Sequence, residues 1–249
     1  MTIASPLISC LCITRNDTAL LQRAIHCFLA QTYPNKELVI VYEDDNLQTA
    51  LFLQTYPAGE NIRSFSVPAR PKSPLGALRN YSLQMAAGDY ICQWDDDDWY
   101  HRERLAVQFR LMQQAGKDAC ILEQWLLFDG HTGKAYLSHK RYWEGSLLCR
   151  KDLVLQNQYA GLAQGEDTPT VTALSNAQHI HLVRQQAHLY IYNYHGRNTW
   201  DYRHFKDFFH YATLLPAQQS LLVEQVLMQQ YDMIQAASLL DEAFTFAPS

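Results

Sequence analysis

Short, almost continuously apolar runs alternate with longer stretches of helical spacing between residues 6 and 116. Apolar runs of this length, bounded by polar residues or proline, are typical of buried strands. Strand–helix units of about 25 to 30 residues predict right-handed crossovers, and therefore a mostly parallel, Rossmann-like α/β sheet with flanking helices. The predicted strands are PLISCLCIT, KELVIVYE, NIRSFSV and DYICQW, and the predicted helices span residues 17–33, 75–88 and 101–116.

The pattern changes beyond residue 118. Residues 118–130 and 134–152 predict strands around the turn DGHTGK, residues 161–177 predict a loop that leads into a helix, and residues 179–196 predict two strands. From Trp200 to Phe244 the spacing is helical, with Pro216 separating two helices. We therefore expect an α/β domain over residues 1–200 and a C-terminal helical extension over residues 201–249 that packs on it.

An apolar stripe of near-helical spacing runs along the last two predicted helices. We expect it to pack on the α/β domain; a homodimer interface and a peripheral contact with a membrane surface are the alternatives. Residues 220–244 contain no Lys or Arg, which argues against anionic lipid. The stripe consists of Leu222, Val226, Met233, Ala237 and Leu240.

Charge and composition exclude several classes of protein. The formal net charge is −5, from 20 basic and 25 acidic residues, and no basic stripe offers a site for nucleic acid. No apolar run approaches the roughly 20 residues that span a membrane, and the first residues lack the pattern of a signal peptide. We therefore expect a cytoplasmic protein. Its six cysteines form no C-x-x-C pair, which favours buried thiols over a metal site or disulfides.

Four consecutive aspartates, Asp95 to Asp98, follow the predicted strand DYICQW. Ligands of open parallel sheets bind at the carboxyl ends of the strands. On an extended chain Asp95 and Asp97 would converge, while Asp96 and Asp98 point elsewhere. Two converging carboxylates repel each other unless a cation lies between them, and hard divalent ions combine carboxylates with substrate phosphates. The sequence thus predicts a metal–diphosphate site. The alternative is a solvated acidic turn in which Asp98 caps the following helix.

Several ordered segments together resemble family 2 glycosyltransferases of GT-A fold, over roughly residues 6–200. They are PLISCLCITRN, AIHCFLAQTYPNKELVIV, LGALRNYSLQMAAGDYICQWDDDD and GED at 165–167. The resemblance implies a divalent cation, Mn²⁺ or Mg²⁺, and a D-x-D motif at Asp95 and Asp97. Residues implied to bind the nucleotide sugar are Thr14, Glu43, Arg79, Asp95 and Asp96, and those implied to bind the metal are Asp97 and His195.

The nucleoside pocket departs from the family pattern. Relatives commonly have VVDDGS after the second strand, whereas this chain has VYEDDN. Glu43 is the residue that we expect in the pocket, with Asp44 and Asp45 as alternatives, so the identity of the base stays open. Arg79 is expected to meet a phosphate or to brace the acidic loop; the alternative is an ordinary charge on a helix surface.

The GED segment is implied to supply the base that deprotonates the acceptor hydroxyl. Asp167 is the expected base, with Glu166 as a neighbour that shares the role or holds the acceptor. Asp167 could instead, or in addition, cap a helix, because Pro169 follows at a first-turn position. Trp143 and Glu144 are expected on the acceptor side, where the alternative is a core tryptophan beside a surface acid.

The sequence therefore predicts a metal-dependent, inverting glycosyltransferase. It would move a sugar from a nucleotide diphosphate donor, a UDP-sugar, to a hydroxyl of a glycan or lipid-linked acceptor. The QxxRW motif of processive synthases is missing, which favours one sugar per encounter. One alternative is a sugar-1-phosphate nucleotidyltransferase, but the loop TRNDTALL lacks the glycines that such enzymes need. Another is a non-catalytic nucleotide-sugar-binding protein, against which the GED segment speaks.

Overall fold

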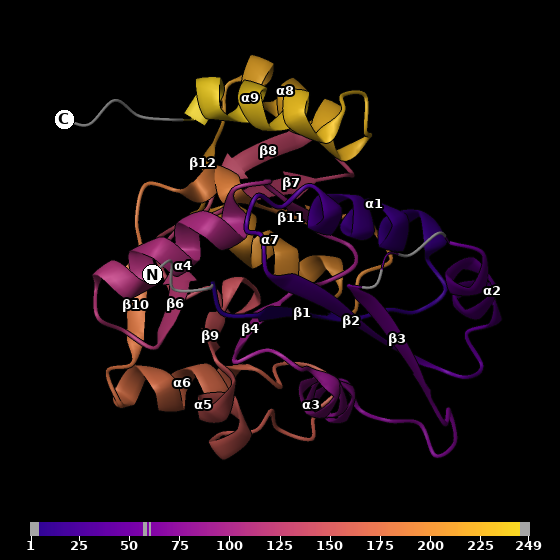
Figure 1. Ribbon diagram of the computed structural model, residues 1–249. Coiled ribbons are helices and arrows are strands. Elements are labelled where there is room, and N and C mark those ends of the chain that lie inside the picture. Colours follow the sequence, from indigo (N-terminus) through magenta and orange to yellow (C-terminus); the bar gives the residue numbers. More distant parts are fainter. Residues whose placement is uncertain (1–4, 57–58, 60, 245–249) are drawn as a thin grey trace.

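The structure is a computed structural model that describes residues 5–56, 59 and 61–244 (Figure 1). Within these residues, seven strands form the main sheet in the order β10–β6–β9–β4–β1–β2–β3. Strands β4, β1, β2 and β3 run parallel, while β9 is antiparallel to both of its neighbours. The bounds are β1 (Ile8–Ile13), β2 (Lys36–Glu43), β3 (Ile62–Val67), β4 (Tyr90–Gln93), β6 (Ala119–Leu122), β9 (Leu148–Arg150) and β10 (Ile180–Val183).

A second sheet of the described residues has the order β12–β8–β7–β11–β5. Here β11 is parallel to β7 and antiparallel to β5, so a strand from late in the chain lies beside the residues that follow the aspartates. The bounds are β5 (Trp99–Tyr100), β7 (Leu126–Asp129), β8 (Lys134–Leu137), β11 (Tyr190–Tyr194) and β12 (Thr213–Leu214).

Helices cover both faces of the main sheet. Figure 1 shows α1 and α4 on one face and α3, α5 and α6 on the other, with α8 and α9 beyond the second sheet. The bounds are α1 (Thr18–Leu29), α2 (Leu47–Thr55), α3 (Leu75–Met85), α4 (Arg104–Gln114), α5 (Lys151–Gln156), α6 (Thr168–Asn176), α7 (Tyr202–Tyr211), α8 (Ala217–Leu227) and α9 (Met233–Phe244), with 3₁₀ turns η1 (Glu144–Ser146) and η2 (Ala187–Leu189).

The predicted mostly parallel α/β sheet is confirmed, and its register explains where the site lies. Ile13 pairs with Val41 and Leu11 pairs with Gln93, so β1, β2 and β4 end at one edge of the sheet. The residues that follow these three strands therefore meet there, which is the usual ligand-binding edge of such sheets.

The C-terminal part of the chain differs from the prediction of two helices. Pro216 does separate α7 from α8, but a second break at residues 228–232, where Gln229 has a φ of 55°, divides the rest into α8 and α9. In the apolar stripe, Val226, Ala237 and Leu240 are buried, and α8 packs against β8. The division of the chain after residue 200 stays a prediction. Residues beyond it also belong to the second sheet and the core, because β12 pairs with β8 and α7 contributes buried residues.

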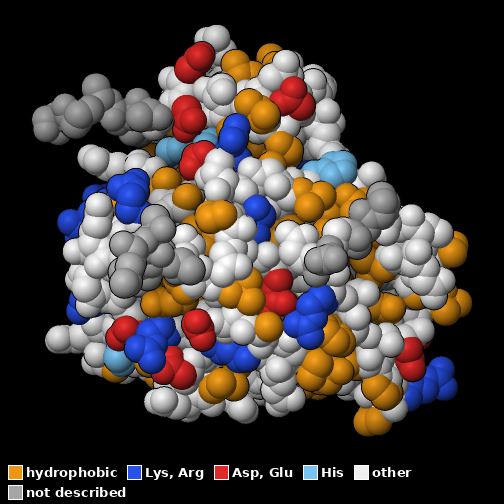
Figure 2. Space-filling model, viewed as in Figure 1, with side chains coloured by type: hydrophobic (Ala, Val, Ile, Leu, Met, Phe, Trp, Pro, Cys, Tyr) orange, Lys and Arg blue, Asp and Glu red, His pale blue; other side chains and the backbone are white. Residues whose placement is uncertain are grey.

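The surface agrees with the charge pattern of the sequence. On the face drawn in Figure 2, acidic and basic side chains are interspersed and form no continuous basic stripe. None of the helices in the described residues combines the length and apolarity needed to cross a membrane. All six cysteines are buried free thiols, as expected.

Candidate active site

Two cavities, of about 210 and 760 Å³, meet over the turn that follows β4. The walls that they share include Asp96, Asp97 and Asn198. The eleven residues predicted from the sequence all line one cavity or both, although their roles stay predictions. The smaller cavity contains Arg79, Asp95, Trp143, Glu144, Glu166 and Asp167, and the larger contains Thr14, Glu43 and His195.

The aspartates lie on a turn and not on an extended strand. Strand β4 ends at Gln93, and β5 begins at Trp99. The alternation expected for Asp95 to Asp98 was therefore wrong, because consecutive side chains point to opposite faces only while the chain is extended. Three consecutive carboxylates, those of Asp95, Asp96 and Asp97, line the cavities.

Asp98 has a structural position that excludes the solvated-turn alternative. It is 1% exposed and accepts hydrogen bonds from the backbone N–H of Asn193 (3.0 Å) and from the Tyr190 hydroxyl. It does not cap α4, which is preceded by Glu103. The buried carboxylate instead fastens the turn to β11.

The aspartate turn is a site of concentrated negative potential. Burial, and then the charge of Asp97, raise the pKa of Asp96 to about 8. Burial also raises the pKa of Asp95, although Arg79 opposes that effect. Carboxylates that resist ionisation in this way are stabilised in their charged forms by a nearby cation.

Asp97 and His195 form a donor pair that fits a divalent cation. Nε2 of His195 lies 3.3 Å from Oδ2 of Asp97, and Nδ2 of Asn198 donates to the same oxygen at 2.9 Å. Nowhere in the described ranges do three His, Cys, Asp or Glu side chains gather closely enough to hold a metal by themselves. One carboxylate and one imidazole suit a cation that completes its coordination with phosphate oxygens.

Arg79 is a buried brace between the D-x-D turn and the GED segment. Its Nε lies 2.7 Å from Oε1 of Glu166 and its Nη2 lies 2.8 Å from Oδ1 of Asp95. The side chain is 7% exposed, so the surface-charge alternative is wrong. Burial acts to lower the pKa of Arg79, but the charges of Asp95 and Glu166 outweigh it and hold that pKa well above its usual value.

Replacing Arg79 by Met should lower the free energy of unfolding by about 2 to 3 kcal/mol, because Glu166 would be left buried without its counter-charge. The cost is below that of a fully buried pair, since Asp95 is 24% exposed and solvent screens it. Urea unfolding of Arg79→Met and Arg79→Lys checks this, and Lys should recover part of the loss. A difference of less than about 0.5 kcal/mol would contradict the brace.

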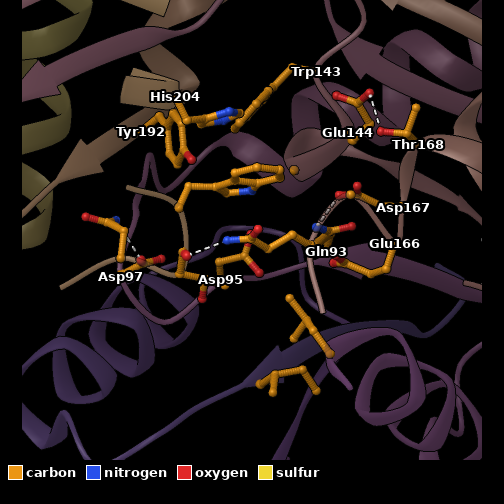
Figure 3. A pocket seen from close by; sticks show the side chains of 18 of the residues that line it. Gln93, Asp95, Asp97, Trp143, Glu144, Glu166, Asp167, Thr168, Tyr192 and His204 are labelled. Atoms are coloured by element: carbon orange, nitrogen blue, oxygen red, sulfur yellow. Dashed lines mark hydrogen bonds between the residues drawn. The ribbon is translucent and has the colours of Figure 1, made fainter. Parts of the chain in front are cut away.

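Asp167 faces the smaller cavity from the start of α6 (Figure 3). It occupies the N-cap position, but its side chain makes no capping hydrogen bond. Its Oδ2 instead accepts a long hydrogen bond from Nε2 of Gln93, at 3.4 Å. The carboxylate is thus held at the cavity wall with capacity for a further proton donor.

Glu144 and Trp143 border the same cavity. Oε1 of Glu144 accepts from the Thr168 hydroxyl at 3.4 Å, and burial raises the pKa of Glu144. Trp143 is 8% exposed and stacks on Trp125 with ring centroids 4.5 Å apart. Trp143 is therefore a core residue that also borders the cavity, and its contact with an acceptor stays a prediction.

An aromatic wall completes the smaller cavity, and sequence reasoning missed it. His204 stacks on Trp200 with ring centroids 4.1 Å apart, and the ring centroids of Tyr192 and Trp143 are 4.6 Å apart. Figure 3 shows Trp143, Tyr192 and His204 on the side of the cavity opposite Asp95 and Gln93. The i, i+4 spacing of His204 and Phe208 on α7 was the available signal, since both line this wall.

Of the three acids considered for the nucleoside pocket, Glu43 is the one that lines the larger cavity. It is 4% exposed and accepts from Nζ of Lys72 at 2.9 Å and from the backbone N–H of Ser73 at 3.3 Å. The alternatives Asp44 and Asp45 are exposed and are not among the residues that line this cavity. The Thr14 hydroxyl donates to Oδ2 of Asp96 at 2.5 Å, which joins the end of β1 to the aspartate turn.

Comparison with known proteins agrees with this geometry. The model of "Glycosyl transferase family 2" matches residues 9–171. The putative colanic acid biosynthesis glycosyl transferase WcaA of Escherichia coli is 37% identical over 111 residues, which cover 44% of this chain and 39% of WcaA. The chain spans less than half the length of the curated relatives that it matches.

Two solved structures share the fold at low sequence identity. Staphylococcus aureus TarS 1–349 in complex with UDP-GlcNAc superposes with a TM-score of 0.64 at 18% identity, covering 96% of this chain and 73% of that chain. The mannosyltransferase PcManGT of Pyrobaculum calidifontis, in complex with GDP-Man and Mn²⁺, gives a TM-score of 0.59 at 13% identity, covering 98% and 76%. The family model matches more than half of the length of this chain. The chain therefore belongs to glycosyl transferase family 2 and has the GT-A fold.

Proposed function

We propose that this protein is an inverting, non-processive glycosyltransferase that uses a divalent cation and a nucleotide diphosphate sugar, a UDP-sugar, as donor. One observation carries the proposal. Two cavities meet at Asp96 and Asp97, with Glu43 in the wall of the larger and Asp167 in the wall of the smaller. This arrangement would place a nucleotide and an acceptor in separate cavities that meet where the sugar is transferred from one to the other.

The larger cavity suits the nucleotide. Glu43 and Thr14 line this cavity and would bind the nucleoside, and Asp95 and Asp96 would lie near the ribose where the two cavities meet. Asp97 and His195 would hold Mn²⁺ or Mg²⁺, which when bound offsets the charge of the diphosphate leaving group. Arg79 keeps Asp95 in place through its ion pair.

The smaller cavity suits the acceptor. Asp167 would take the proton of the acceptor hydroxyl while that oxygen forms a bond to the anomeric carbon. The bond from the anomeric carbon to the diphosphate oxygen breaks, and its electron pair leaves with the nucleoside diphosphate. Attack from the face opposite the leaving group inverts the anomeric configuration.

The aromatic wall and the polar groups of the smaller cavity favour a sugar hydroxyl as acceptor. Aromatic rings such as Trp200 present apolar faces to a sugar ring, and Glu144 and Gln164 supply hydrogen-bonding groups. We accordingly propose a hydroxyl of a glycan or lipid-linked acceptor, in line with the name of WcaA. The buried free thiols fit a cytoplasmic setting, which is part of this proposal.

Hydrolysis of nucleotide sugars tests the proposal without knowledge of the acceptor, because water can replace it. UDP-GlcNAc, UDP-glucose and GDP-mannose are incubated with the protein and Mn²⁺ or a chelator, and the released sugar is followed by ¹H NMR. We expect slow hydrolysis of a UDP-sugar that a chelator stops, with the inverted anomer appearing first.

Two results would contradict parts of this proposal. Release of the anomer with retained configuration would exclude the single displacement. Metal-dependent binding of UDP without hydrolysis or transfer of any donor would instead indicate a non-catalytic nucleotide-sugar-binding protein.

A further inference from the structure

Arg23 is a buried cation that the proposed reaction does not use. It lies on α1, is 4% exposed, and donates hydrogen bonds to two backbone carbonyl oxygens. Nη2 donates to the carbonyl of Asp97 at 2.5 Å, and Nη1 donates to the carbonyl of Leu227 at 3.2 Å. The guanidinium therefore joins the aspartate turn to the last residue of α8.

Both carbonyls are suited to a cationic donor. Leu227 lies at the C-terminus of α8, where helix carbonyls lack intrahelical partners and carry partial negative charge. The carbonyl of Asp97 lies among four carboxylates and accepts from one other side chain, Nδ2 of Asn193, at 3.3 Å. A planar guanidinium can reach two such acceptors at once from a fixed position.

The far side of this bridge is anchored. Val223 and Val226 of α8 are buried, and the Ser220 hydroxyl oxygen accepts from the backbone N–H of Ala135 on β8 at 3.1 Å. The end of α8 is thus fixed to the second sheet, and Arg23 transmits that position to the turn. Because α8 is packed against the second sheet, it holds the turn, and with it Asp97, more firmly than an exposed helix would.

The helix α9 holds the same region from a second side. Nε2 of His188 lies 3.2 Å from Oδ1 of Asp241, and Nε2 of His101 lies 3.3 Å from the carbonyl of Ala237 and 3.5 Å from Asp241. His101 follows β5, which comes directly after the aspartates, and His188 precedes β11, which ends beside His195. Through His101 and His188, α9 therefore contacts the chain next to β5 and β11, the two strands that adjoin Asp97 and His195.

We propose that Arg23, acting with the C-terminal end of α8, is a positioning residue for the cation at Asp97. This gives the C-terminal helices a function in the site. Loss of Arg23 keeps the Asp97 carboxylate but removes a hydrogen bond that fixes the position of its backbone. The inference rests on the proposed function, since it takes Asp97 to be a metal ligand.

The experiment is a titration with Mn²⁺ followed by electron paramagnetic resonance, in the presence and absence of UDP. In Arg23→Gln we expect Mn²⁺ affinity to fall about tenfold, as for other residues that support a metal ligand. The affinity for UDP in chelator should change less than about twofold, because none of the groups proposed to meet the nucleoside contacts Arg23. Arg23→Lys, which can reach one carbonyl, should recover part of the loss.

The matched control is Arg110→Gln, which makes the same substitution on the exposed face of α4. It should leave both affinities unchanged. Circular dichroism and thermal unfolding establish that each variant is folded, and Arg23→Lys serves if Arg23→Gln is not. A folded Arg23→Gln protein with the Mn²⁺ affinity of the wild type would overturn the inference alone, and so would wild-type affinity of Arg23→Lys if Arg23→Gln does not fold. A wild-type protein that binds no Mn²⁺ with UDP would overturn the proposed function as well.

Discussion

Asp167→Asn should nearly abolish sugar transfer while the protein still binds its donor. Asn keeps the size of the side chain and its contact with Gln93, but it cannot accept the acceptor proton. Loss of a general base costs about 10²- to 10⁴-fold in turnover. The measurement is the rate of donor hydrolysis or transfer, set beside the affinity for UDP and Mn²⁺ in the same variant.

Two controls distinguish a base from a generally disturbed site. Asp89→Asn makes the same change at an exposed residue just before β4, at the end of the sheet away from the cavities, and should have no effect. Glu166→Gln should weaken the fold through Arg79 more than it weakens the chemistry, since Glu166 is 4% exposed and already paired. Full activity in Asp167→Asn combined with loss in Glu166→Gln would assign the base to Glu166.

The sequence predicted the main sheet because each of its early strands carries a local signal. The runs that form β1, β2 and β4 are largely apolar and buried, and an amphipathic helix, α1, follows β1. The helix α2 was missed because it has no apolar face to detect. Leu47 and Leu51 are 73% and 63% exposed, and only Thr49 of its nine residues is buried.

The aspartates show where local reasoning stops. Their presence at a strand end was visible in the sequence, and so was the expectation of a site there. Their geometry depends on residues about 90 to 100 positions later, because Asn193 and Tyr190 bind Asp98 and close the turn. No pattern within the DDDD run could have shown that Asp98 is buried while Asp96 faces a cavity.

Arg23, Lys72 and Asn198 were missed for a related reason. Each is a polar residue on a helix or loop whose role is set by a distant partner, such as Leu227 for Arg23 and Asp97 for Asn198. Such residues have no periodicity, and their types are common on surfaces. They were recognisable only once the chain had brought its partners together.

Asp97→Asn should remove most of the gain in donor affinity that Mn²⁺ provides. With Mn²⁺, we expect the affinity for UDP to fall about 100-fold, more than for loss of a residue that merely supports a ligand. A neutral amide is a poorer ligand for a hard cation than a carboxylate. Of the two proposed protein ligands, only His195 would then bind the cation together with the phosphates.

Without metal the same substitution should have the opposite sign. Asp97 is one of four neighbouring aspartates, and its negative charge repels an anionic diphosphate when no cation is bound. Removing one negative charge should leave metal-free binding of UDP unchanged or somewhat tighter than in the wild type. Calorimetric titrations of UDP into both proteins, with Mn²⁺ and with chelator, measure the two effects together.

The crossing of these two effects distinguishes a metal ligand from a residue that only shapes the turn. A substitution that merely disturbed the loop would weaken binding with and without Mn²⁺. Equal affinity of Asp97→Asn and wild type in the presence of Mn²⁺ would mean that the cation, if one binds, is held elsewhere. Weaker binding with Mn²⁺ and unchanged binding with chelator would mean that Asp97 binds a cation that also contacts the diphosphate. The aspartates would then be close together in order to hold that cation.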